Sequence, residues 1–126
     1  MNFFSGELVE NGATLFRNKS FTIQIPGNLT KSINGNKSEK IILGVRPEDF
    51  SLDSSENKAD NSLEALVEVI EPMGSENYLY LKAEDQDFII RTSPSTNLKI
   101  NDKIKLYINL DNIHLFDENS SNALIN

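Results

Sequence analysis

The apolar residues of this chain come in short runs, most of them with a period of two, which predicts β-strands. Residues 21–25 alternate, with Phe21, Ile23 and Ile25 on one predicted face. Residues 41–45 are almost wholly apolar, which favours a strand that is covered on both faces. Runs this short and this evenly spaced are typical of a small all-β barrel or sandwich.

Two hairpins are predicted from turn residues that separate alternating segments. The first spans residues 7–16 around Asn11 and Gly12, and the second joins residues 78–81 to residues 88–91 through a polar turn. Residues 103–110 predict a strand with its apolar residues on one face and Lys103, Lys105, Tyr107 and Asn109 on a half-solvated face. Residues 113–116 are predicted to be the last strand.

The segment 63–71 fits two patterns. Leu63, Leu66, Val67 and Ile70 fit one face of a helix, whereas Leu63, Ala65, Val67 and Val69 fit one face of a strand. The segment is short, its second half is β-branched, and proline, methionine and glycine follow it, which together favour the strand.

Polar segments divide the predicted strands. Residues 28–40 and about 53–62 are rich in Asn, Lys, Ser and Asp and predict mobile loops, the first with room for one helical turn. Residues 118–126 predict a polar C-terminal tail. The expected organisation is therefore one domain over residues 1–117, followed by the tail.

Composition excludes several classes of chemistry. The 126 residues carry 12 Lys and Arg against 19 Asp and Glu, a net charge of −7, which disfavours a nucleic acid or polyphosphate bound on a broad basic face. The chain has no cysteine and one histidine, so thiolate and multi-histidine metal sites are excluded. No apolar run approaches the length of a membrane helix and the start lacks a secretion signal, so we expect a cytoplasmic protein without direct membrane insertion.

No catalytic motif is complete. Gly35, Asn36, Lys37 and Ser38 resemble the end of a phosphate-binding loop but lack its glycines. His114 has no second histidine or cysteine, so we interpret it as a structural or interface residue. Tyr78, Tyr80 and Tyr107 are compatible with a stacking platform for single-stranded nucleic acid, although dispersed lysines favour packing. We expect no catalytic residue, no cofactor and no metal.

Three segments, in this order and spacing, resemble the C-terminal domain of ATP-binding subunits of sugar-type ABC importers, the group that includes the maltose and glycerol-3-phosphate transporter ATPases. They are Gly44-Val45-Arg46-Pro47-Glu48-Asp49-Phe50, Val69-Ile70-Glu71-Pro72-Met73-Gly74-Ser75-Glu76 and Ile113-His114-Leu115-Phe116-Asp117. Residues 1–6 resemble the junction between the ATPase domain and this C-terminal domain. The resemblance covers residues 1 to about 120.

The resemblance implies an OB-like β-barrel, a TOBE domain, in a form with two small barrels of interleaved strands. It also implies a regulatory and dimerisation role, and partners that include a second copy, the ATPase domain, the membrane permease subunits and, in some members, a regulatory protein. In the full transporter the domain would lie at the inner face of the cell membrane. The alternatives are a small oxyanion-binding module of the molybdate type and an OB-type nucleic-acid-binding module.

The sequence departs from this family in two respects. Asn101 and Asp102 stand where the family commonly has Gly-Asp, and asparagine tolerates the left-handed conformation that such a turn requires. Neither a Walker A loop nor an ABC signature is present, so the chain lacks the family's means of ATP hydrolysis. This predicts an excised fragment of a transport ATPase, with a truncated gene product as the alternative.

The residues singled out here are expected to have structural or interface roles. Arg46 and Glu48, on either side of Pro47, are candidates to hold the strand exit against a neighbouring loop, with an exposed and weak ion pair as the equal alternative. Gly74 is expected to supply an unusual backbone angle. The remaining structural or interface candidates are Glu71, Glu76, His114, Leu115 and Phe116, with core packing favoured over interface contact for Leu115 and Phe116.

Overall fold

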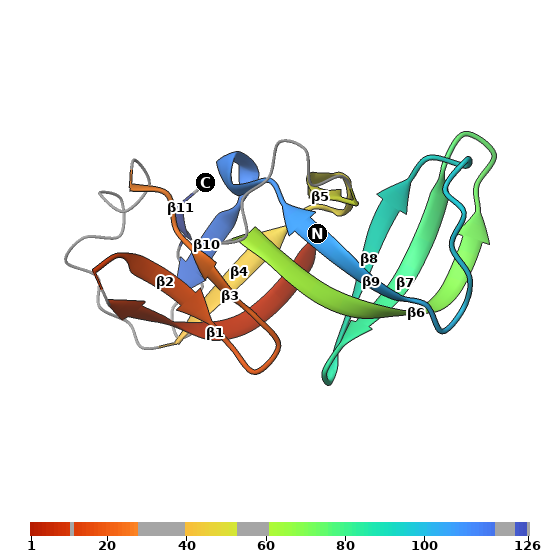
Figure 1. The fold of residues 1–126 in the computed structure, drawn as a ribbon. Coiled ribbons are helices and arrows are strands. Elements are labelled where there is room, and N and C mark those ends of the chain that lie inside the picture. Colours follow the sequence, from red (N-terminus) through yellow and green to blue (C-terminus); the bar gives the residue numbers. More distant parts are fainter. Residues whose placement is uncertain (11, 28–39, 53–60, 118–122, 126) are drawn as a thin grey trace.

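The computed structural model describes residues 1–10, 12–27, 40–52, 61–117 and, as backbone, 123–125, and these form two antiparallel sheets (Figure 1). The first sheet has the strand order β11-β10-β4-β1-β2-β3. Its strands are β1 (Asn2–Glu10), β2 (Thr14–Arg17), β3 (Thr22–Gln24), β4 (Ile41–Val45), β10 (His114–Asp117) and β11 (Ala123–Ile125).

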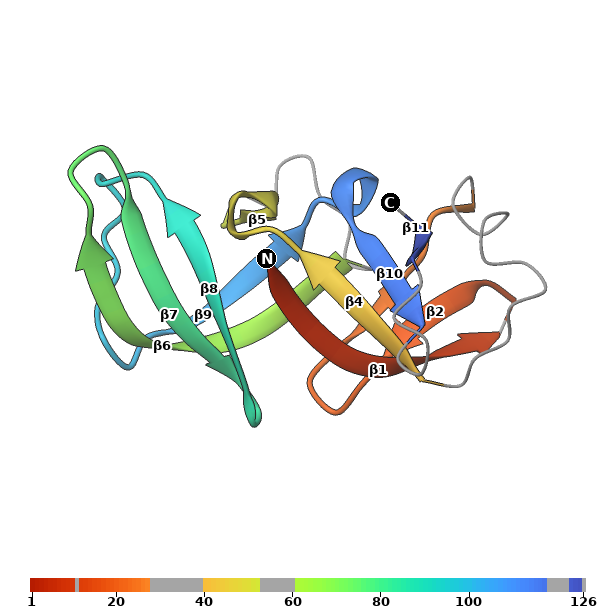
Figure 2. The same ribbon diagram turned by 180° about the vertical axis from the view of Figure 1, so that it is seen from behind.

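The second sheet is built entirely from the segment between β4 and β10, so it is an insertion into the first (Figure 2). Its order is β5-β9-β6-β7-β8. The strands are β5 (Phe50–Ser51), β6 (Ser62–Pro72), β7 (Asn77–Ala83), β8 (Gln86–Thr92) and β9 (Lys103–Ile108). The chain thus leaves the first sheet once and returns to it once.

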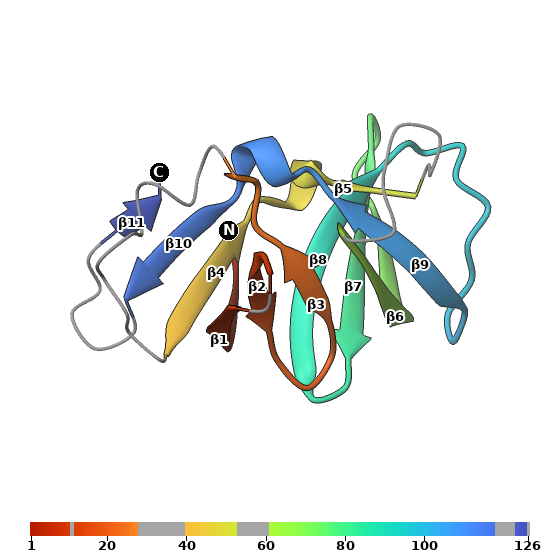
Figure 3. The same ribbon diagram turned by 60° about the vertical axis from the view of Figure 1, so that its left-hand side comes forward.

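Each passage between the sheets is a short 3₁₀ turn, η1 (Pro47–Asp49) on the way out and η3 (Leu110–Asn112) on the way back. The two turns are bonded to each other, because the Asn109 amide donates to the Asp49 carbonyl at 2.8 Å. The Asn112 side-chain amide also donates to the Asp49 carboxylate at 3.0 Å. Figure 3 shows the two turns side by side at one end of the sheets.

A cluster of phenylalanines joins the cores of the two sheets. Phe4 on β1 has no exposed surface, and its ring centroid lies 5.3 Å from those of both Phe21 and Phe88. The Phe50 ring lies 5.3 Å from that of Phe88, so Phe88 contacts both Phe4 of the first sheet and Phe50 of the second. Edge-to-face and tilted aromatic pairs of this kind add stability beyond that of the buried area. The core therefore spans both sheets.

Polar side chains also connect the sheets across their shared boundary. The Asn2 carboxamide donates to the Ile89 carbonyl at 2.6 Å and accepts from the Ile89 amide at 2.9 Å. Asn2 is only 9% exposed. Because β8 is an edge strand, this side chain occupies the place that a further strand would take. Two further bonds join Ser20 to Ala83 and Gln86 to Phe3.

The predicted all-β fold is confirmed, including the strand at residues 63–71 and both hairpins. Phe21, Ile23 and Ile25 are all buried, as their alternation indicated. Asn101, at the position where the family commonly has glycine, has a φ of 76°, so asparagine does adopt the left-handed conformation there. The predicted turn around Asn11 falls partly outside the described residues, as do most of the two predicted loops.

Several expectations were wrong in detail. Residues 113–116 are not the last strand, because the predicted polar tail contributes β11 to the sheet edge. At the end of the second predicted loop, Asn61 is buried and donates to the Ile108 carbonyl at 2.7 Å. Tyr107, assigned to a half-solvated face, is only 9% exposed. Val69 is 49% exposed because a bulge at Glu68, between Val67 and Val69, moves it to the other face.

Candidate interaction surfaces

Arg91 on β8 joins two of the segments that the sequence analysis singled out. Its guanidinium lies 4.0 Å from the Glu48 carboxylate and 3.8 Å from the Glu76 carboxylate. It also lies over the ring of Tyr78, 5.8 Å from the centroid. The Glu76 carboxylate, followed by Tyr78, raises the pKa of Arg91 above its ordinary value. We call this set the Arg91 cluster; it is solvent-screened, so its contacts orient the loops more than they stabilise them.

Arg46 and Glu48 do not pair with each other among the described residues. Within the described part of the chain, Arg46 forms no ion pair and no side-chain hydrogen bond, and Glu48 reaches Arg91 instead. Pro47 takes the first position of η1, where its fixed φ suits the turn and its missing amide hydrogen costs nothing. Sequence reasoning missed Arg91 because no motif surrounds it; only its register opposite Tyr78 brings it to the two loops.

Glu71 lies near the end of β6, and Gly74 lies in the connection from β6 to β7. Gly74 has a φ of 89°, the left-handed angle expected of it, and the Met73 amide donates to the Glu76 carbonyl to close the turn. Glu71 accepts a hydrogen bond from the Tyr80 hydroxyl at 3.1 Å. This bond holds the phenol proton and so raises the pKa of Tyr80 above its ordinary value.

A groove lies along β6, β7 and β8 next to the Asn2 bridge, with a volume of about 540 Å³. Its polar residues include three carboxylates, and we call it the acidic groove. It is lined by Asn2, Glu68, Val69, Glu71, Tyr80, Leu81, Asp87, Phe88 and Ile89. Tyr78 and Tyr80 share the outer face of β7, whereas Tyr107 is buried on β9. The three tyrosines therefore do not form a single stacking platform.

An aromatic patch covers the outer face of β1, β4 and β10; it consists of Met1, Phe3, Gly44, His114 and Phe116. Phe3 is 54% exposed, and its ring lies edge-on to that of Phe116 at 6.2 Å. The His114 ring stacks on Phe116 at 6.4 Å with 16° between the planes. A Cβ on Gly44 would lie 2.7 Å from the Met1 sulfur, so the glycine lets Met1 close over β4. Leu115, between the two patch residues of β10, points the other way and is completely buried.

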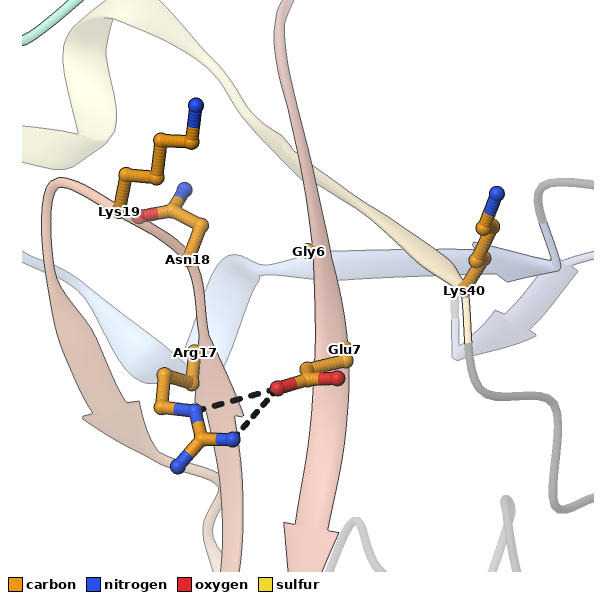
Figure 4. A pocket seen from close by; sticks show the side chains of 6 residues that line it. All are labelled: Gly6, Glu7, Arg17, Asn18, Lys19 and Lys40. Carbon is orange, nitrogen blue, oxygen red and sulfur yellow. Dashed lines mark hydrogen bonds and ion pairs between the residues drawn. The ribbon is translucent and has the colours of Figure 1, made fainter.

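A second, open pocket of about 470 Å³ lies over β1 and the β2–β3 turn, lined by Gly6, Glu7, Arg17, Asn18, Lys19 and Lys40 (Figure 4). Arg17 donates to one oxygen of Glu7 through Nε at 3.2 Å and through Nη2 at 2.6 Å. In Figure 4, neither ammonium group of Lys19 and Lys40 points toward this pair. The positive charge of Arg17 is thus already paired with the Glu7 carboxylate.

No group of three or more acidic or histidine side chains among the described residues is placed to hold a metal ion. The same part of the chain contains no helix that is long and apolar enough to span a bilayer.

Comparisons with known proteins match both parts of the fold. The family described as TOBE domain matches residues 43–116, and the MalK OB fold domain matches residues 1–50. The oligosaccharides import ATP-binding protein MsmX of Bacillus subtilis is 30% identical over 93% of this chain and 32% of its own length. The xylose/arabinose import ATP-binding protein XacK of Haloferax volcanii is 32% identical over the whole chain and 32% of its own length.

The chain spans about a third of the length of the curated relatives it matches. Among solved structures, the cytoplasmic molybdate-binding protein ModG with molybdate bound superposes with a TM-score of 0.67. That match covers 90% of this chain and 94% of the other at 17% identity, so it shows a shared fold and no more. The TOBE domain family matches more than half of the residues, and the arrangement of the strands agrees with it. The chain therefore belongs to the TOBE domain family and has an all-β, OB-like fold.

Proposed function

We propose that this chain is the non-catalytic regulatory and dimerisation domain of the ATP-binding subunit of a carbohydrate ABC importer. The support is its similarity, over nearly its whole length, to import ATP-binding proteins for oligosaccharides and for pentoses. The complete subunit would carry an ATPase domain, work with membrane permease subunits and lie at the cytoplasmic face of the membrane. Within it, residues 1–117 would act as one regulatory unit.

The aromatic patch is the surface that best supports dimerisation. It places Phe3 and Met1, 54% and 46% exposed, beside Phe116 and His114 on one sheet face. Exposed apolar residues gathered in one patch mark interaction sites more often than scattered ones do. A two-fold contact in which Phe3 of each copy packs on the other would remove both from water.

Light scattering coupled to size-exclusion chromatography tests this contact over a wide concentration range. We expect a mass near twice 14.2 kDa for the unaltered chain and a shift to monomer for Phe3→Ser. Ile100→Ser is the matched control, because Ile100 is 57% exposed and lies outside the patch. A strict monomer at every concentration, or equal loss of dimer in both variants, would remove the dimerisation half of the proposal.

The transporter half is tested by exchange of domains. We expect MsmX of Bacillus subtilis to retain oligosaccharide uptake when this chain replaces the third of MsmX that it matches. A chimera that is folded and abundant but supports no uptake would contradict the proposal. The oxyanion-binding alternative rests on the fold likeness to ModG alone, and calorimetry with molybdate should give no binding heat.

A further inference from the structure

The acidic groove carries three carboxylates whose charge this chain compensates only in part. Glu68 and Glu71 line it from β6 and Asp87 from β8, and no cation is among its described lining residues. Asp87 forms an ion pair with Lys82 of β7 at 3.8 Å. Glu68 has no ion pair within the described residues. The groove is therefore a concave surface of negative charge, which attracts cations from outside the molecule.

The same groove presents an apolar and aromatic strip. Val69 pairs with Tyr80, and Tyr80 pairs with Ile89, so the three side chains lie in a row across three strands. Val69 is 49% exposed, and the bulge at Glu68 is what turns it into the groove. Interfaces characteristically combine such an aromatic centre with a charged rim.

Hydrogen bonds within this chain already fix the side chains that line the groove. Asn2 fixes β8 to β1 through two hydrogen bonds to Ile89, and Glu71 fixes the Tyr80 hydroxyl. A partner would lose little affinity to ordering these side chains, because they are already placed.

We propose that the acidic groove binds a basic segment of a partner protein. Lysine or arginine side chains of the segment pair with Glu68, Glu71 and Asp87, and an apolar side chain between them covers Val69 and Tyr80. The inference rests on the proposed regulatory function and gives the chemistry of the regulator that the domain receives. It is separate from the aromatic patch, which lies on the other sheet.

The probe for this proposal is a fluorescein-labelled octapeptide that alternates lysine with leucine, compared with one that alternates glutamate with leucine. Fluorescence anisotropy should show binding of the basic peptide only, weakening at least tenfold between 50 mM and 500 mM salt. The double variant Glu68→Gln/Glu71→Gln should weaken binding three- to tenfold, in line with two lost rim ion pairs.

Matched controls separate the groove from general acidity. Glu64→Gln/Asp111→Asn removes the same charge outside the groove and should leave the affinity within twofold. Val69→Ser keeps every charge and should weaken binding at least fivefold. Equal binding of both peptides, equal losses in the two double variants, or an unaffected Val69→Ser would overturn the proposal.

Light scattering on the same variants keeps the two proposals apart. The groove variants should keep the dimer, and Phe3→Ser should keep peptide binding. If Glu68→Gln/Glu71→Gln abolishes the dimer instead, a second copy occupies the groove and the basic-segment proposal is wrong.

Discussion

Replacing Asn2 by alanine is expected to destabilise the protein by about 2–4 kcal/mol. The wild-type carboxamide bonds both backbone groups of Ile89, at 2.6 and 2.9 Å, in a position that is 9% exposed. Each hydrogen bond contributes about 0.5–1.5 kcal/mol, and a buried backbone group left without a partner costs about 1–3 kcal/mol. Partial access of water to the β8 edge keeps the total below the sum of the upper limits.

Urea denaturation followed by circular dichroism measures this loss as a lower midpoint at an unchanged slope. The chain has no tryptophan, and all three tyrosines lie on the second sheet, so tyrosine fluorescence reports that sheet alone. Since Asn2 joins the sheets, we expect Asn2→Ala to separate the fluorescence transition from the circular dichroism transition. Asn2→Asp should destabilise more, because it sets a carboxylate oxygen against the Ile89 carbonyl.

The control is Asn97→Ala, at an exposed loop position, which should change stability by no more than about 0.5 kcal/mol. A loss for Asn2→Ala no larger than that of the control would refute the view that this carboxamide holds the two sheets together. Coincident transitions in the variant would show that the phenylalanine core alone makes the sheets one cooperative unit.

Three further predictions concern single contacts. Gly6→Ala should lower the free energy of unfolding by about 1–3 kcal/mol, because the new Cβ would lie 2.5 Å from the Phe16 ring and 2.7 Å from the Arg17 carbonyl. Thermal unfolding measures this loss of stability. Gly74→Ala, at a φ of 89°, should cost about 1 kcal/mol, whereas Gly27→Ala, with open space and no positive φ, should be neutral by the same assay. The Tyr80 hydroxyl bond to Glu71 raises the pKa of Tyr80 above 10.0, so its stabilising effect holds below about pH 10 and is lost as pH rises further; ultraviolet titration should show Glu71→Gln bringing that pKa down.

The sequence predicted most strands because period-two alternation is a local property. It predicted the wrong face for Val69 because a bulge changes which side a residue takes, and nothing in the alternation around Glu68 marks the extra residue. It missed β11 because three residues in a polar context carry no pattern of their own, and only the open edge of β10 recruits them.

The candidate surfaces were predictable only in part. Glu48 and Glu76 lie in segments that the sequence analysis singled out, whereas Arg91, which contacts both, has no sequence signal. Asn2 is a similar case, since an asparagine in a strand usually faces water and this one completes a sheet edge. Both residues act through pairing across strands that only the folded topology brings together.

The most specific of the three segments, residues 44–50, is explained by the passage between the two sheets. Gly44 leaves space for Met1 at the end of β4, Pro47 begins η1, and Asp49 holds η3 through Asn112, so the outgoing and returning chains meet there. Phe50 then enters the core that both sheets share. Each of these four positions meets a different steric or hydrogen-bonding demand of one crossing. The residues of this segment therefore fit the place where the chain passes from the first sheet into the inserted second sheet.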